Sequence, residues 1–252
     1  MRAFSWAVLG VLLAATLVAA ASFDRRRWPQ LVGDEATYLM QAESLAWDFD
    51  LRYERADYDR FLAHWGRRPE GLILQSSDGG RSLTYGKPAL YALAIAPFVR
   101  LSPVRGAAVA NALYLAAAAI AAAFALERRL GGAAALWVAG FVFASVTFAH
   151  VFWAHSDLFL MSLVAVGLAL VFGAPQSGAG PARWAAAGAL LAAVAASRPF
   201  YASLLAAAAF AAPRPRRRPW LALAAGAAAV LAAVVTWDLA TRGTWTSYGA
   251  ER

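Results

Sequence analysis

Long apolar runs constrain the fold of this chain more than any other feature. The first extends from Phe4 to Ser22 behind a single basic residue, Arg2. A helix needs roughly 20 apolar residues to cross a bilayer. The chain as a whole is 61% hydrophobic and 15% charged, whereas soluble domains carry about 25% charged residues. We therefore expect an integral membrane protein.

Further apolar runs follow in the second part of the chain. They lie at 104–126, 131–153, 157–174, 184–196, 200–212 and 219–240. If the two short runs around Arg198 were one span, an arginine would lie near the middle of the bilayer, which costs several kcal/mol. Two short helices that meet at Arg198 are expected instead. The predicted fold is all-α: a polytopic transmembrane helix bundle with about seven spans and short interfacial helices in the first external loop.

The expected organisation has three parts. Residues 4–22 form the first span, residues 23–103 an external loop with interfacial helices, and residues 104–240 six further spans. The small residues from Ala19 to Ala21 also fit a signal-peptidase site, so a cleaved signal peptide is an alternative to a first span.

Two helices and one turn are predicted within the external loop. Residues 34–47 have apolar side chains spaced for one face, which predicts an amphipathic helix with Asp34 as its N-cap. Pro88 is expected to open an apolar helix over 88–100 that lies at the interface, because it is too short to cross. Residues 76–80 are turn formers and predict a loop.

The basic residues are distributed as in a membrane protein. Residues 23–88 hold 10 basic and 11 acidic side chains, so the net charge of +8 comes from the rest of the chain. There the arginines cluster at the ends of apolar runs, at Arg128 and Arg129 and again from Arg214 to Arg218, as in cytoplasmic loops. A nucleic-acid-binding surface would place them along one solvated face, so no nucleic-acid partner is expected.

Four ionisable residues fall on one membrane face when the spans are counted outward from a cytoplasmic N-terminus. Asp34 and Asp157 are acids, and Lys87, the only lysine in the chain, and Arg198 are cations. Singly, the acids suit helix N-termini, Arg198 a helix C-terminus and Lys87 a snorkelling position. Together they combine a carboxylate that can deprotonate a hydroxyl with cations that can stabilise a departing phosphate. Group transfer from a lipid phosphate needs that combination.

Metal and thiol chemistry have little support in the sequence. His150 and His155 lie near Asp157, but their i, i+5 spacing does not put both on one helix face and no third ligand is evident. No metal site is predicted, with a divalent metal kept as the alternative. The absence of cysteine excludes disulfides, thiolate zinc sites and thiol nucleophiles.

Five short segments follow one another along nearly the whole chain. They are Gly33-Asp34-Glu35-Ala36-Thr37-Tyr38, Tyr85-Gly86-Lys87-Pro88, Val104-Arg105, His155-Ser156-Asp157 and Ser197-Arg198-Pro199-Phe200. This order resembles the N-terminal half of the C-type (GT-C) membrane glycosyltransferases, in the branch of protein O-mannosyltransferases and aminoarabinose transferases. The resemblance implies a bundle of about a dozen spans with interfacial helices in the first loop.

The resemblance also implies a reaction and its partners. The family moves a sugar from a polyprenyl-phosphate carrier to an acceptor hydroxyl at the periplasmic or luminal face. The expected partners are therefore a polyprenyl-phosphate-linked sugar, membrane lipids and an acceptor glycan, lipid or protein. A multi-pass protein of the bacterial inner membrane, with its active side toward the periplasm, is the expected location.

Site residues carry over by position. Asp34 would be the general base of an inverting transfer, and Asp157 the second acid, which helps to hold the acceptor. Lys87 and Arg198 would contact the lipid phosphate. The neighbours of Asp34 on its helix, Glu35 and Tyr38, would support it.

The chain departs from the family in two respects. In the aminoarabinose branch an acidic metal ligand precedes the lysine, whereas this chain has Gly86, so no cofactor is predicted. The family also continues with further spans, so a fragment, or half of a site completed elsewhere, is expected. Two other functions stay open: a non-catalytic lipid-phosphate binding or transport protein, in which Asp34 would be dispensable, and an inactive truncated protein.

Overall fold

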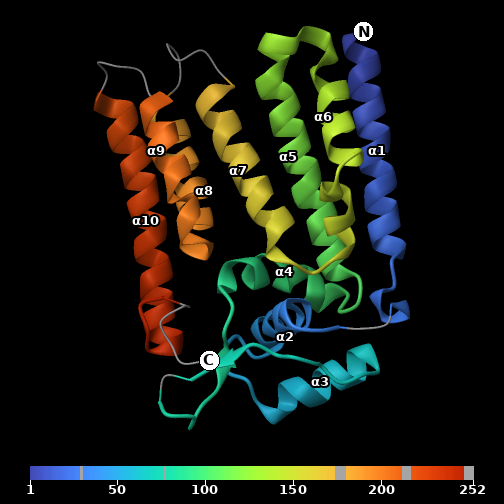
Figure 1. Ribbon diagram of the computed structural model, residues 1–252, viewed down its shortest axis with the longest axis vertical. Helices are drawn as coiled ribbons and strands as arrows, with labels where there is room; N and C mark the ends of the chain where they lie inside the picture. The colour runs from blue at the N-terminus through green and yellow to red at the C-terminus, as the bar shows by residue number, and fades with distance from the viewer. Residues whose placement is uncertain (29–30, 77, 174–179, 212–216, 247–252) are drawn as a thin grey trace. The chain divides into compact units, whose positions relative to one another are not determined.

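The computed structural model describes residues 1–28, 31–76, 78–173, 180–211 and 217–246. Within these ranges the secondary structure is helical except for one two-stranded sheet, which confirms the all-α expectation. The α-helices are α1 (Arg2–Ser22), α2 (Asp34–Trp47), α3 (Arg55–Trp65), α4 (Ala89–Leu101), α5 (Gly106–Leu130), α6 (Ala134–Phe143), α7 (Ser156–Phe172), α8 (Pro181–Ser197), α9 (Ala202–Ala211) and α10 (Arg217–Arg242) (Figure 1). Arg214 and Arg216 of the basic cluster, and residues 248–252, lie outside the described ranges.

The chain divides into two compact units. Unit 1 comprises Met1–Thr16, Leu113–Phe148 and Asp157–Val234. Unit 2 comprises Leu17–Ala112, Ala149–Ser156 and Val235–Arg252. Most of the apolar helices therefore belong to unit 1, and the polar first loop belongs to unit 2.

Three helical stretches of the described chain are long and apolar enough to cross a membrane. They are Arg2–Ser22, Gly106–Phe143 and Arg218–Arg242. The expected span 157–174 coincides with α7, and 200–212 with the stretch Pro199–Ala211, both of which are shorter apolar helices. By length and composition, the three long stretches indicate a membrane protein.

The expected span 131–153 is not a single α-helix in the structure. α6 ends at Phe143, and the chain continues as a 3-10 helix, η3 (Val146–Phe152). Within unit 1, the Ser145 hydroxyl donates to the carbonyl of Val142 and accepts from the amide of Thr147. Hydroxyl side chains that bond the nearby backbone compete with the α-helical ladder.

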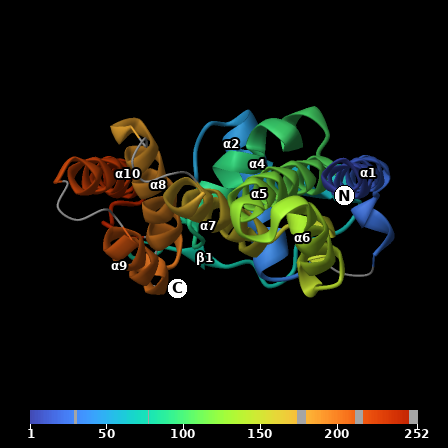
Figure 2. The same ribbon diagram turned by 90° about the horizontal axis from the view of Figure 1, so that it is seen from above.

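The core of unit 1 includes a cluster formed by α7 to α10, which lie next to one another in Figure 2. Its buried members are Val171, Trp184, Ala187, Leu191, Ala208 and Leu223. α8 and α10 approach so closely that a Cβ at Gly188 would overlap the carbonyl of Leu223, and one at Gly226 would overlap that of Ala185. Small residues allow this kind of backbone contact between membrane helices.

In unit 2, α2 occupies the predicted range but differs from the prediction in two ways. Its N-cap is Gly33, at φ 62°, and Asp34 is the first helical residue, so the N-cap prediction for Asp34 is wrong. Every residue from Glu35 to Ala46 is buried, so over this range the helix turns no polar face to solvent. Buried polar side chains of α2 bond to other parts of unit 2; Gln41, for example, donates to the carbonyl of Lys87 at 3.0 Å.

Three other elements of unit 2 surround α2. The predicted helix at 88–100 is confirmed as α4, which has Pro88 as its N-cap and packs along α2. The sequence did not predict α3, which packs on α2 and has Gly66, at φ 67°, as its C-cap. It also missed the antiparallel sheet of β1 (Leu74–Gln75) and β2 (Thr84–Tyr85). The described residues of the predicted loop 76–80 lie between these two strands.

Asp57, on α3, gives the fold a measurable pH dependence. Its side chain is buried and forms a capping box with Glu54, and burial raises its pKa from 3.8 to about 6. Between about pH 4 and pH 6 the folded protein therefore holds a proton that the unfolded chain releases. The stability that Asp57 contributes is complete below pH 4 and is lost as the pH rises to 6. A two-unit shift corresponds to at most about 3 kcal/mol.

We expect Asp57→Asn to flatten the fall in thermal stability between pH 4 and pH 6 in detergent solution. The control is Asp59→Asn on the same helix, which changes the half-exposed partner of Arg55. The pH dependence of the control should match that of the wild type. Equal pH dependence in the wild type and Asp57→Asn would contradict the assignment.

Candidate functional site

Asp34 lies at the centre of a polar cluster in unit 2. Its Oδ1 is 2.7 Å from Nζ of Lys87, and its Oδ2 is 3.2 Å from Nε2 of His155. The lysine and histidine side chains are mostly buried, with 19% and 11% of their surface exposed, while Asp34 keeps 35%. Both carboxylate oxygens thus have a nitrogen partner, and the group still reaches solvent.

The charge state of Asp34 follows from these contacts. Partial burial disfavours the carboxylate, but the hydrogen bond and positive charge of Lys87, with a further contribution from His155, lower the pKa of Asp34 below its usual value. Asp34 is therefore ionised at neutral pH and accepts hydrogen bonds only. It follows that Nε2 of His155 carries the hydrogen that lies between them.

One face of α2 supplies three of the groups around Lys87. Asp34, Tyr38 and Gln41 occupy positions i, i+4 and i+7, which lie on one side of a helix. Nζ of Lys87 lies 6.0 Å from the centre of the Tyr38 ring, and the Tyr38 hydroxyl donates to Ser156 at 3.1 Å. The polar stripe is visible in the sequence once the helix is assigned, and it is the signal that points to Gln41.

The backbone of Lys87 is fixed by two buried side chains. Its carbonyl accepts hydrogen bonds from Nε2 of Gln41 at 3.0 Å and from Nη2 of Arg242 at 2.6 Å. Arg242 is wholly buried at the end of α10 and pairs with Asp238 at 3.1 Å. Sequence reasoning missed Arg242, because an arginine that ends an apolar helix has the ordinary pattern of a flanking charge.

The segment that carries His155 is also held from inside unit 2. Nδ2 of the buried Asn111 donates to the carbonyls of His150, Val151 and Trp153, the last at 3.0 Å. The Tyr91 hydroxyl donates to Oδ1 of Asn111 at 3.1 Å. These bonds fix the backbone just before His155.

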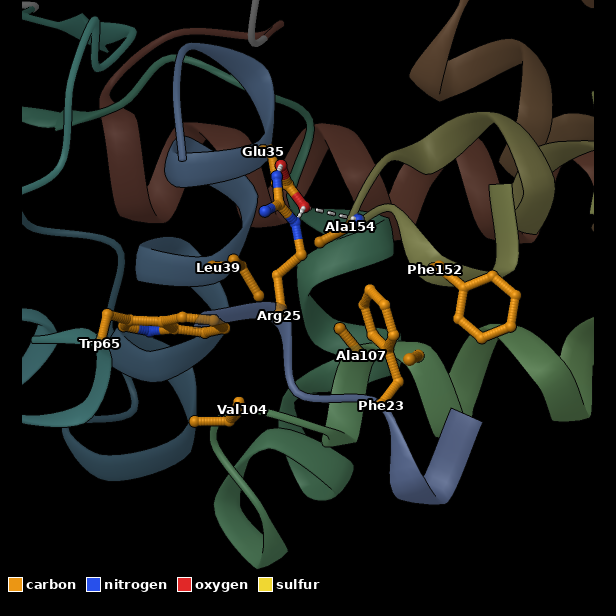
Figure 3. A pocket seen from close by; sticks show the side chains of 10 residues that line it. Phe23, Arg25, Glu35, Leu39, Trp65, Val104, Ala107, Phe152 and Ala154 are labelled. Carbon is orange, nitrogen blue, oxygen red and sulfur yellow. Dashed lines mark hydrogen bonds and ion pairs between the residues drawn. The ribbon is translucent and has the colours of Figure 1, made fainter. Parts of the chain in front are cut away.

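Glu35 supports the cluster indirectly, through the residue that precedes His155. It forms a buried, two-pronged ion pair with Arg25, at 2.9 and 2.6 Å, and accepts the amide of Ala154 at 3.4 Å. Figure 3 shows this pair at the wall of a small hollow, which is lined mainly by apolar side chains such as Leu39 and Phe152. Glu35 thus fastens the residue before His155, and its own carboxylate is occupied.

The second predicted acid and cation pair with each other in unit 1. Arg198 is the C-cap of α8 and donates from Nη2 to Oδ1 of Asp157, in the first turn of α7. Both side chains are partly exposed, at 35% and 43%. The expected break at Arg198 is confirmed, since α8 ends at Ser197 and a new helical stretch begins at Pro199.

In the structure the four predicted residues form two separate acid–base pairs, one in each unit. His155 joins the first pair, although its sequence spacing indicated only a weak metal site. In the described ranges, no group of three or more His, Asp or Glu side chains could hold a metal ion. The cluster around Asp34 can accept a proton at the carboxylate and bind an anion at Lys87.

Comparison with known proteins gave no match. No protein-family model, no curated protein and no solved structure matches the chain.

Proposed function

We propose that this chain is part of a membrane glycosyltransferase that moves a sugar from a polyprenyl-phosphate donor to an acceptor hydroxyl with inversion. The observation that carries the proposal is the 2.7 Å pairing of Lys87 with Asp34. It sets a carboxylate base directly beside a cation that can bind phosphate. The resemblance to the GT-C glycosyltransferases, drawn from the motif order, independently assigns these roles to the same residues.

The proposed reaction divides the work between the two kinds of residue. Asp34 takes the proton of the acceptor hydroxyl as its oxygen attacks the anomeric carbon. The bond between that carbon and the phosphate oxygen breaks, and the lipid phosphate leaves with one more negative charge. Within unit 2, Lys87 is assigned to stabilise this charge.

The proposed setting is the bacterial inner membrane, with these residues toward the periplasm and seven crossings in all. Three crossings correspond to α1, α5 and α10, which make up most of the three long apolar stretches. The other four correspond to α6 with η3, α7, α8 and α9, which are shorter. A helix of 17 residues such as α7 is about 25 Å long, and bilayers adapt to such a mismatch at modest energetic cost.

A transfer assay tests the proposal directly. The complete reading frame that contains this chain is expressed in nanodiscs and supplied with polyprenyl-phosphate-linked hexoses and pentoses plus acceptor lipids and glycans. We expect release of free polyprenyl phosphate, and a product whose anomeric configuration is opposite to that of the donor. Release no faster than from empty nanodiscs, across all donors and acceptors, would reject the proposal.

Lys87→Met should weaken binding of the lipid phosphate. A hydrogen bond to a charged group contributes about 1.5–3 kcal/mol, which corresponds to about 10- to 100-fold in affinity. Undecaprenyl phosphate binding to the protein in nanodiscs measures this loss. The matched control is Arg55→Met, which removes one positive charge from an exposed position on α3. An unchanged affinity for Lys87→Met, or an equal loss in the control, would contradict a specific role for Lys87.

A further inference from the structure

We infer that His155 is a positioning residue, which holds Asp34 in place when Lys87 leaves it for the phosphate of the donor lipid. The inference rests on the proposed function for its catalytic consequence. The contact itself is a property of the protein without ligand and can be tested there.

Asp34 and the phosphate of the donor lipid compete for Lys87. Its ammonium group lies on Oδ1 of Asp34, and the proposed reaction requires the same ammonium group on a phosphate. The closer Lys87 moves to the phosphate, the less it holds Asp34. When it leaves, Oδ1 becomes free to accept the proton of the acceptor hydroxyl.

A carboxylate released in this way needs a second contact to keep its direction. His155 supplies one, because its Nε2–H lies on the other oxygen, Oδ2, at 3.2 Å. A donor on Oδ2 leaves Oδ1 available, so orientation and proton acceptance use different atoms. A misplacement of about 1 Å at a reacting group can cost about 10²-fold in rate.

The surroundings of His155 fit a fixed support. The ring packs edge-on against Tyr38, with centroids 5.9 Å apart, and against Trp153 at 5.1 Å. Asn111 holds the backbone carbonyls of His150, Val151 and Trp153, and Glu35 holds the amide of Ala154. Lys87 has a long flexible side chain, whereas His155 has a packed ring on a fastened backbone. Of the two partners of Asp34, Lys87 is therefore the one that can move.

Nitrogen-15 NMR of histidine-labelled protein in detergent tests the contact without any ligand. The chain has only three histidines, so His64→Phe and His150→Phe assign the imidazole signals. Asp34→Ala removes the acceptor and gives the position of the Nε2 signal without the contact. We expect Lys87→Met to keep the His155 Nε2 signal near its wild-type position, because Asp34 stays on the ring when the lysine is gone.

Two results would overturn the inference. The Nε2 signal in Lys87→Met could move to the position seen in Asp34→Ala, which would mean that the lysine, and not the histidine, holds the carboxylate. Alternatively, Asp34→Ala could leave all three histidines unchanged, which would mean that the contact does not exist.

Kinetics of the transfer reaction provide the second readout. His155→Phe keeps a ring but loses the donor, so we expect kcat to fall about 10²-fold with the KM for the donor unchanged. His155→Gln keeps an N–H donor at a similar distance and should restore most of the rate. His150→Phe is the matched control and should behave as the wild type. Equal losses in the Phe and Gln variants, together with a raised KM, would contradict a positioning role.

The proposed function and the positioning role of His155 can be rejected separately. If the wild type transfers no sugar while the NMR result is as expected, the proposed function is wrong and the contact stands. If transfer is observed but the Nε2 signal follows Asp34→Ala, the reaction stands and His155 does not position the base.

Discussion

Asp34→Asn is expected to abolish sugar transfer while binding of undecaprenyl phosphate persists or becomes tighter. Loss of a general base lowers the rate by about 10²–10⁴-fold. Binding should not suffer, because the variant removes a carboxylate that competes with phosphate for Lys87. Turnover of the donor and affinity for undecaprenyl phosphate are measured on the same nanodisc preparation.

This pair of measurements separates the proposed enzyme from its rivals. A lipid-phosphate binding or transport protein would keep its activity in Asp34→Asn, because binding needs the cation and not the base. Asp59→Asn, an exposed acid on α3, is the control for a general loss of negative charge. Transfer by Asp34→Asn at the wild-type rate would show that Asp34 is not the base.

Arg242→Met should cause the largest loss of stability of any change considered, about 3–5 kcal/mol. Its guanidinium group is fully buried between Asp238 and the carbonyl of Lys87. Removal of one partner leaves the buried carboxylate of Asp238 without its counter-charge. Unfolding in detergent measures the loss, and Arg55→Met, at an exposed pair, should leave the stability near that of the wild type.

A double variant separates the two roles of Arg242. Arg242→Met combined with Asp238→Leu removes both charges, and apolar replacement of a buried ion pair is often neutral in stability. We expect stability to recover. The carbonyl of Lys87 still lacks one of its two donors, so undecaprenyl phosphate affinity should stay reduced by up to about tenfold. Full recovery of both properties would mean that Arg242 does not position Lys87.

The sequence predicted the elements whose ends depend on residues that are close together in the chain. The range of α2 was predicted correctly from Asp34 as a helix start and the apolar spacing that follows it, and the break at Arg198 from the cost of an arginine in the middle of a bilayer. Hydropathy could not predict that α6 would end at Phe143. The end of α6 depends on side-chain hydroxyls that hydrogen-bond to the backbone just after it. Hydropathy averaged over a sequence window does not detect such bonds.

The polar residues of α2 were misread for a physical reason. Polar residues on a helix usually indicate solvent, but Glu43 accepts from Trp65 and Gln41 donates to Lys87, partners 22 and 46 positions away. Only the folded chain brings them together. The same limit hid Arg242, 155 residues from the carbonyl that it binds.

The pairing of the site residues was foreseen only in part. Charge and motif order selected Asp34, Lys87, Asp157 and Arg198, and the structure pairs acid with base twice. Neither signal indicated that His155 would contact Asp34, since the two residues are 121 positions apart and the expected spans 104–126 and 131–153 lie between them.

The glycine contact between α8 and α10 sets an order for biogenesis. Gly188 packs against the backbone near Leu223, and Gly226 against that of Ala185, so α8 has no partner for this face until α10 has been synthesised. In the proposed seven-span topology, α8 and α9 enter the lipid before α10, with the bare strip of α8 against acyl chains. In that topology the translocon releases, or retains, an incomplete helix hairpin that becomes tightly packed only when the third helix arrives.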